Sequence, residues 1–231
     1  MAASSSTVDD TPAADASANR AHFKPLLRGL FHQVAFVVAI PALVILTVAA
    51  RTGTARVAAI VYGLGVCALY GVSSSYHRFG WGPAARERMK RADHGTIFVM
   101  IAATYTPVCL LVLHGALRID LLVGVWLAAV TGLVLALLGV SQRHGIGFGL
   151  YLGMGWLAAI ALPELAHKVG GGGIALLVAG GLLYTVGAVI LASGRPDPFP
   201  RVFGYHEVWH SMVIAASACH WFLILALMRT A

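Results

Sequence analysis

The heptapeptide "GYHEVWH", residues 204–210, contains side chains that could bind and use a metal ion. His206, Glu207 and His210 form the pattern H-E-x-x-H. Two histidines four residues apart on a helix point to the same side and can bind one ion. In soluble zinc proteases the glutamate between them acts as a general base. The motif alone predicts a zinc site, with a protease as the first hypothesis to test.

Two further motifs supply complementary groups. "SSSYHRF" places Ser73 and His77 one helical turn apart, and "RADHGTIF" contains Asp93 and His94. An imidazole from His77 would complete a three-histidine set and leave a fourth position for water, as catalytic zinc requires. Imidazole also suits copper, nickel and iron, so zinc is the preferred metal and not the only one that fits.

Asp93 and Ser73 are the candidate catalytic residues. Asp93 would take up a proton from a metal-activated water or bind the metal directly, and Ser73 would support the site through a hydrogen bond. Simpler roles exist for each residue alone. Asp93 and Glu207 could cap helices, because a negative charge is favourable at a helix N-terminus. His77 could be an interfacial residue at a helix end. Three separate motifs that each carry such groups are better explained by one shared site than by coincidence.

The composition indicates a membrane protein. Of the 231 residues, 59% are hydrophobic and 11% are charged, against roughly a quarter charged in soluble domains. The formal charge of +7 arises from Lys and Arg clustered between apolar stretches. Membrane topology explains such clusters, so we expect no nucleic-acid partner.

The chain divides into two parts. Residues 1–21 are small, polar and mildly acidic, and predict a disordered cytoplasmic tail without a signal peptide. Residues 22–231 form the predicted transmembrane domain. Cys67, Cys109 and Cys219 are far apart within apolar segments, so we expect free thiols.

The predicted fold is all-α, a bundle of seven transmembrane helices. A spanning helix needs about 20 mostly apolar residues. The candidates are residues 30–50, 57–77, 94–114, 119–140, 146–166, 173–193 and 207–228.

The distribution of Lys and Arg predicts the orientation of these helices. Eleven of the 16 lie on the side of the N-terminus, five of them between the second and third spans. The positive-inside rule therefore puts the N-terminus in the cytoplasm and the C-terminus outside. With this topology, the three polar motifs meet at the cytoplasmic face. Ionisable groups at membrane depth are costly, and so mark a functional site.

The remaining histidines fit other roles. His220 lies ten residues after His210, or about 15 Å along a helix, and is too distant to share the ion. We expect it to make a polar contact inside the bundle. An interfacial role is expected for the histidines near span ends or in loops: His22, His32, His114, His144 and His167.

Together, these motifs resemble the hemolysin III proteins, the bacterial branch of the progestin and adipoQ receptor family. The resemblance runs from about residue 25 to the end and rests on "SSSYH", on "RADH" followed by "IAATYTP", and on "HEVWH". It implies seven spans, a cytoplasmic N-terminus and a plasma-membrane protein with zinc near the cytoplasmic face. The resemblance maps the zinc ligands to His77, His206 and His210, and maps Ser73 and Asp93 to the polar residues around the zinc-bound water.

The receptor members of this family are similar to alkaline ceramidases in the layout of the site. That similarity implies a zinc-dependent hydrolase of a lipid amide or ester bond, with a membrane lipid as substrate. It gives the water-handling role to Asp93 and makes a protease with Glu207 as base improbable. Two alternatives are open: a regulator of membrane homeostasis with a structural zinc and a bound lipid, and a pore-forming hemolysin.

Overall fold

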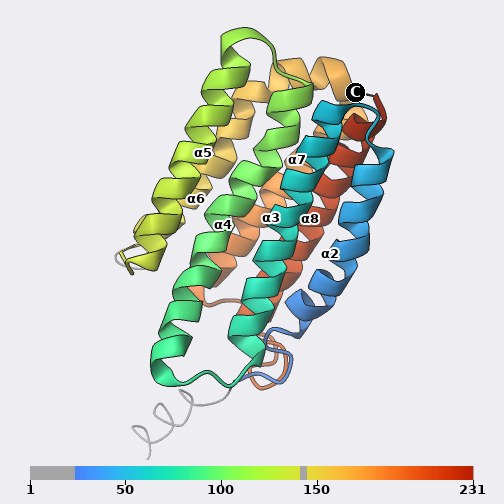
Figure 1. Ribbon diagram of the computed structural model, residues 1–231. Coiled ribbons are helices and arrows are strands. Elements are labelled where there is room, and N and C mark those ends of the chain that lie inside the picture. Colours follow the sequence, from blue (N-terminus) through green and yellow to red (C-terminus); the bar gives the residue numbers. More distant parts are fainter. Residues whose placement is uncertain (1–23, 141–144, 231) are drawn as a thin grey trace, which may run out of the picture.

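The computed structural model describes residues 24–140 and 145–230, so the predicted tail at residues 1–21 lies outside the described residues. The regular elements are helices: α2 (Leu30–Ala49), α3 (Gly53–Arg78), α4 (Pro83–Leu111), α5 (Gly115–Leu137), α6 (Ile146–Trp156), the short 3-10 helix η1 (Leu157–Ala161), α7 (Leu162–Ser193) and α8 (Tyr205–Thr230). Figure 1 shows them side by side in one elongated bundle. The all-α prediction is confirmed.

Within the described residues, six helical segments are long and apolar enough to cross a membrane. Five match predicted spans, and the sixth runs through α6, η1 and α7 over 48 residues, Ile146–Ser193. The sequence predicted two spans in this region. α7 contains a kink at Gly170, whose backbone has φ 65° and ψ −173° and joins two helices.

α4 begins at Pro83, well before the predicted start at residue 94. Four of the five basic residues that the sequence placed in a connection therefore lie on the first turns of α4, and the fifth, Arg78, ends α3. Proline is favourable at the first position of a helix, and the Ala, Arg, Glu, Met and Lys residues that follow are good helix formers. Hydropathy detects only the apolar part of such a helix and misses its extension into water.

The helices divide into inner and outer members of the bundle. α3 and α4 bury 56% of their most apolar stretch and α8 buries 44%, against 22% for α2 and 28% for α5. α8 packs mainly on α7 and also contacts α2, α3 and α4. α8 therefore has neighbours on several sides, and Glu207, Trp209 and His210 in its first turns are buried.

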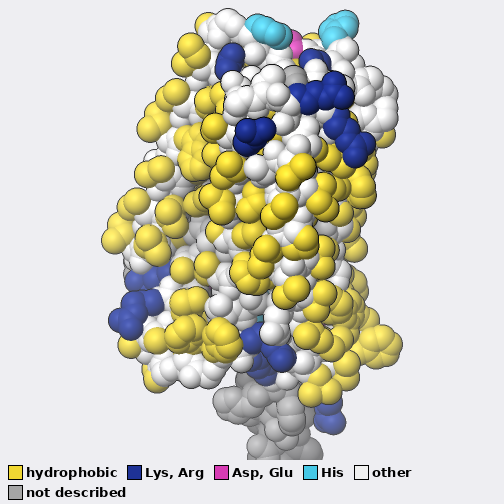
Figure 2. Space-filling view, turned by 45° about the vertical axis from the view of Figure 1, so that its right-hand side comes forward, with side chains coloured by type: hydrophobic (Ala, Val, Ile, Leu, Met, Phe, Trp, Pro, Cys, Tyr) yellow, Lys and Arg dark blue, Asp and Glu magenta, His cyan; other side chains and the backbone are white. Residues whose placement is uncertain are grey.

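The outer helices expose large apolar side chains. Examples are Val37 on α2, Leu127 on α5 and Leu182 on α7, each at least half exposed. Figure 2 shows a broad hydrophobic band on one face, with Lys and Arg side chains toward both ends of the molecule. Apolar patches of this extent are rare on soluble monomers, so the band is the surface that faces lipid.

Two tyrosines and a serine link three helices inside the bundle. The hydroxyl groups of Tyr184 on α7 and Ser217 on α8 are 2.7 Å apart. Tyr62 on α3 donates a hydrogen bond to the carbonyl oxygen of Ser217 at 3.3 Å. These contacts hold α3 and α7 against α8. The three cysteines are free thiols, as predicted.

Candidate metal centre

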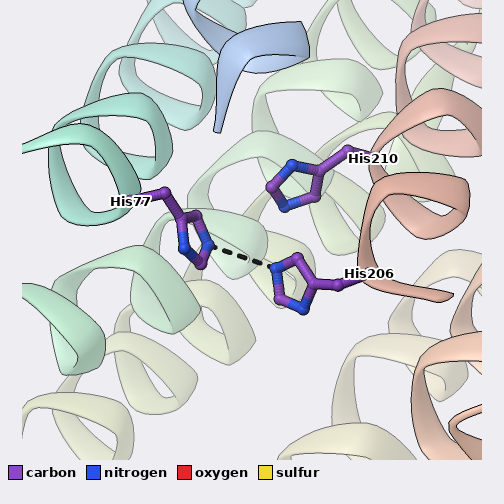
Figure 3. Close-up of side chains that lie close together, drawn as sticks. All are labelled: His77, His206 and His210. Atoms are coloured by element: carbon purple, nitrogen blue, oxygen red, sulfur yellow. Dashed lines mark hydrogen bonds between the residues drawn. The ribbon is translucent and has the colours of Figure 1, made fainter. Parts of the chain in front are cut away.

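The three histidines lie on two of the inner helices, α3 and α8. His77 is the penultimate residue of α3, and His206 and His210 lie in the first turns of α8. The spacing of four residues puts His206 and His210 on one side of α8, as the sequence predicted. In Figure 3 all three imidazoles point toward one another across the gap between the two helices.

The distances fit a shared ion. One nitrogen from each ring can be chosen so that the three lie within 4.8 Å of one another. Nε2 of His77 and Nε2 of His206 are 3.2 Å apart. Zinc–nitrogen bonds of about 2.0–2.1 Å put two imidazole nitrogens on one tetrahedral ion roughly 3.4 Å apart. The cluster can therefore hold a metal ion with small side-chain adjustments.

Burial and hydrogen bonding support the same conclusion. His77 and His210 are 7% and 2% exposed. Nδ1 of His210 is buried and has no hydrogen-bond partner among the described residues. Neutral imidazoles gathered away from water without full hydrogen bonding are costly, and a bound cation removes part of that cost.

Asp93 and Ser73 lie beside the cluster. Oδ2 of Asp93 is 3.6 Å from Nε2 of His77, and Ser73 lines the same cavity as Asp93. Both side chains are buried. Because α4 begins at Pro83, Asp93 lies inside that helix and is no N-cap. This placement removes the capping alternative for Asp93, and its catalytic or ligating role stays a prediction, as does that of Ser73.

Both carboxylate oxygens of Glu207 make hydrogen bonds that hold the start of α8. The residue is fully buried, and its Oε1 accepts a hydrogen bond from Nε of Arg28 at 2.5 Å. Its Oε2 accepts a second bond from the backbone N–H of Gly204 at 2.9 Å. The carboxylate thus fixes the start of α8, which agrees with the capping role considered for it. Both oxygens are occupied, so Glu207 is a poor candidate for the base of a protease.

The segment before α2, residues 24–29, closes this end of the site and is called the N-terminal strap below. The backbone N–H groups of Leu26 and Leu27 donate to the carbonyl oxygens of Arg201 and Val202 at 3.1 and 3.2 Å. The Lys24 ammonium donates to the carbonyl oxygen of His77. The strap therefore ties the connection before α8 to the end of α3.

Two residues of the strap show how closely it lies on the site. Gly29 has φ 80°, and a β-carbon added there would lie 2.5 Å from Cβ of His77. Glycine is needed at this position for both its backbone angle and its lack of a side chain. Partial burial and the charges of Arg86, Arg78 and Arg28 lower the pKa of Lys24. Positive charge is thus concentrated around this end of the site.

His32 was wrongly predicted to be interfacial. It lies in the first turn of α2, is only 3% exposed, and stacks on His210 with ring centroids 3.8 Å apart. A histidine inside an apolar span was the signal available in the sequence. The rotation of α2 toward α8, which the sequence does not give, is what brings His32 to the site.

The other histidines divide between the surface and the interior. His114 and His167 are exposed, and their interfacial role stays a prediction. His220 is buried, and its Nε2 contacts the carbonyl oxygen of Leu177 at 3.4 Å, which confirms the predicted polar contact inside the bundle. His22 and His144 lie outside the described residues.

An apolar cavity of about 270 Å³ extends from the histidine cluster along the bundle. Its polar end includes Ser73, Asp93, His206 and His210. The rest of the lining is mostly hydrophobic and comes from α4, α6, η1, α7 and α8. Trp156 and Leu182 also line it, and they are 56% and 50% exposed. The cavity therefore reaches the lipid-facing surface between α6 and α7.

Comparisons with known proteins agree with this architecture. The model of the family described as "Haemolysin-III related" matches residues 21–221. The chain is 34% identical over 203 residues to "Hemolysin-3" of Bacillus cereus, covering 87% of this chain and 90% of that protein. It is also 34% identical to the "Hemolysin-3 homolog" of Bacillus subtilis, with 87% and 92% covered.

A mammalian relative is more distant. The human "Monocyte to macrophage differentiation factor" is 29% identical over 173 residues, which cover 73% of this chain and 69% of that protein. The family match covers most of the chain, and both bacterial relatives match it over nearly their full length. The protein is therefore a multi-pass membrane protein that belongs to the haemolysin III-related family.

Proposed function

We propose that this protein is a zinc-dependent hydrolase that cleaves an amide or ester bond of a membrane lipid. One observation carries the proposal: a buried three-histidine cluster and a neighbouring carboxylate lie at the end of an apolar cavity that reaches the lipid-facing surface. A soluble substrate would not need such a path. A lipid could enter sideways between α6 and α7 and place its polar head at the histidines.

His77, His206 and His210 would hold the metal. Zinc is favoured because three neutral nitrogen donors with one open position are typical of catalytic zinc sites. When bound, zinc supplies Lewis acidity that polarises a carbonyl group and makes water acidic near neutral pH.

The roles of the chain's own residues follow from their positions. Asp93 would accept a proton as the oxygen of water adds to the carbonyl carbon of the lipid. It would then return that proton to the amine nitrogen or alcohol oxygen as the bond from this atom to the carbonyl carbon breaks. The products are the amine or alcohol and a fatty acid. Ser73, which lines the same cavity, would hydrogen-bond Asp93 and keep the carboxylate oriented. The apolar walls of the cavity would hold the acyl chain and keep bulk water out.

We further propose that the chain crosses the membrane seven times, with the N-terminus and the metal site at the cytoplasmic face. The segment Ile146–Ser193 has 48 residues, or about 72 Å of helix, more than twice a hydrocarbon core of about 30 Å. In Figure 1 the described chain begins at one end of the bundle and ends at the other, which requires an odd number of crossings. The kink at Gly170 lies where the chain would turn between the two crossings.

A non-enzymatic regulator is the second candidate. The histidine cluster joins the end of α3 to the start of α8, and Asp93 lies 3.6 Å from His77. If Asp93 bound the ion as a fourth ligand, the site would be closed and structural. The name of the Bacillus cereus relative also suggests lysis, but a cavity with mostly apolar walls favours a lipid over an ion path.

A hydrolysis assay tests the enzyme. Purified protein should release fatty acid from at least one member of a panel of ceramides, other acyl amides and phospholipids, and a zinc chelator should abolish the release. Asp93→Asn should keep near-stoichiometric zinc and lower the rate by about 10²–10⁴-fold, the usual contribution of positioned acid–base help. Glu207→Gln should lose far less activity, because Glu207 pairs with Arg28.

Three results would argue against this mechanism. Loss of zinc in Asp93→Asn would make Asp93 a ligand and favour the regulator. A larger loss of rate in Glu207→Gln than in Asp93→Asn would restore Glu207 as the base. No turnover of any lipid by the zinc-loaded protein would leave the enzyme without support.

A further inference from the structure

His32 contacts the metal centre from α2, a third helix. Its ring stacks on that of His210 with centroids 3.8 Å apart and an angle of 9° between the planes. Tyr70 of α3 lies against His32, with ring centroids 5.0 Å apart. His32 and Tyr70 are 3% and 4% exposed. One face of the His210 imidazole is therefore covered by a flat ring that is itself held in place.

The stack gives His210 an orienting contact in place of the hydrogen bond that a metal-binding imidazole usually makes. A metal-binding imidazole usually donates its second ring N–H to a carboxylate or carbonyl, which fixes the orientation of the ring. In the described parts of the chain, Nδ1 of His210 is buried and has no such partner. Without another contact, the ring could rotate about its side-chain bonds away from the direction that the ion requires.

We propose that His32 is a positioning residue of the metal centre, which holds His210 in the plane needed to bind the ion. The inference rests on the proposed zinc site and adds to it a residue outside the three-histidine set. Neither ring nitrogen of His32 has a hydrogen-bond partner among residues 24–140 and 145–230. The contact with His210 is therefore made by ring faces, and it leaves the nitrogens at the edge of the His210 ring available.

This arrangement makes metal affinity depend on the position of α2. The N-terminal strap leads directly into α2 and holds Glu207 through Arg28, so the start of α2 and the start of α8 are joined twice. A shift of α2 along or around its axis would remove the ring from His210 while leaving His77, His206 and His210 in the chain.

Zinc affinity in three variants tests the proposal. In His32→Ala, and in His32→Leu, which fills the space without a flat ring, the zinc dissociation constant should rise about 10–100-fold, the usual effect of losing a residue that orients a ligand. His32→Phe keeps a flat ring and should stay within about threefold of the unaltered protein. Competition with a chelator of known affinity measures the constant. The absorption bands of the cobalt-loaded protein, which report ligand geometry, should shift in the Ala and Leu variants and not in Phe.

The matched control is Leu46→Ala. Leu46 is fully buried on the same helix, fourteen residues or about 20 Å from His32, so its loss should lower stability and leave zinc affinity unchanged. Unchanged affinity in both His32→Ala and His32→Leu would overturn the proposal. Equal losses in Phe and Ala would also overturn it, because the nitrogens and not the stack would then act. No zinc binding by the unaltered protein would instead overturn the zinc site itself.

Discussion

At the scale of single residues, the arrangement around His77 is the most informative feature. Its Nε2 lies 3.2 Å from Nε2 of His206 and 3.6 Å from Oδ2 of Asp93. Each ring brings one nitrogen to the cluster, and in a neutral imidazole that nitrogen is either a donor or an acceptor, so the three nitrogens cannot all be paired with one another. A cation at their centre would accept a lone pair from each of the three rings, with the Asp93 carboxylate nearby. The residue chemistry therefore favours a metal ion over a hydrogen-bonded histidine cluster.

Replacement of single histidines tests the metal site. Purified protein should carry about one zinc per chain, and His77→Ala, His206→Ala and His210→Ala should each lose most of it, because two imidazoles seldom hold zinc alone. Elemental analysis of protein purified without added metal measures the content.

His114→Ala and His167→Ala are matched controls, since both side chains are exposed. They should retain the full zinc content. Full retention in His77→Ala would show that α3 takes no part in the site.

At the scale of elements, the start of α8 is fixed by groups from outside that helix. Glu207 joins it to Arg28 of the N-terminal strap and to Gly204 of the preceding connection. His206 directly precedes Glu207 in the first turn of α8, so the contacts that hold this start also hold the backbone from which His206 faces His77. The carboxylate in H-E-x-x-H thus positions the ligands on either side of it, and the strap becomes part of the site.

A double-mutant cycle on Arg28→Met and Glu207→Gln tests this element-scale link. The pair is buried on the Glu207 side and only 20% exposed at Arg28, so we expect a coupling free energy of about 0.5–3 kcal/mol in unfolding. Each single variant should lower the midpoint of thermal unfolding, and the double variant should fall less than the sum of the two.

The Arg91–Glu87 pair provides the comparison, because it is also an Arg–Glu contact, at 3.0 Å, but lies on the exposed surface of α4. Surface ion pairs one helical turn apart contribute little. A cycle on Arg91→Met and Glu87→Gln should show much smaller coupling. Equal coupling in the two pairs would mean that Arg28 and Glu207 do not act as a clamp.

At the scale of the whole molecule, the apolar band and the direction of the chain support the proposed topology. Hydrophobic side chains form a broad band on the face shown in Figure 2. In Figure 1 the described chain starts at one end of the bundle and finishes at the other. The basic first turns of α4 and the N-terminal strap lie at the same end as the histidines. The positive-inside rule predicts that this end faces the cytoplasm.

Reporter fusions test this topology. A reporter at the N-terminus, and one inserted between α3 and α4 at Gly80, should respond as cytoplasmic, whereas one after Ala231 should respond as external. The expected pattern follows from seven crossings with the basic end inside. Reporters at the two chain ends on the same side would eliminate the seven-span topology and require the segment Ile146–Ser193 to cross once.

The sequence by itself determined the properties that depend on local pattern. Apolar runs of about 20 residues identified the membrane segments, because the thickness of the hydrocarbon core sets their length. The four-residue spacing of His206 and His210 predicted their common direction, because the helical repeat fixes it. His77, Asp93 and Ser73 were placed near them by the alternating direction of the spans. These inferences needed no knowledge of how one helix is rotated against another.

Only the tertiary structure decided the contacts that depend on helix rotation and on segments far apart in the sequence. His32, predicted at the membrane interface, stacks on the face of His210. Glu207 pairs with Arg28, which is 179 residues away in the sequence. The structure also showed that Asp93 lies inside α4 and that the cavity opens between α6 and α7. Hydropathy gives the length of a helix but not its rotation about its own axis, which is set by the packing of side chains against all neighbouring helices.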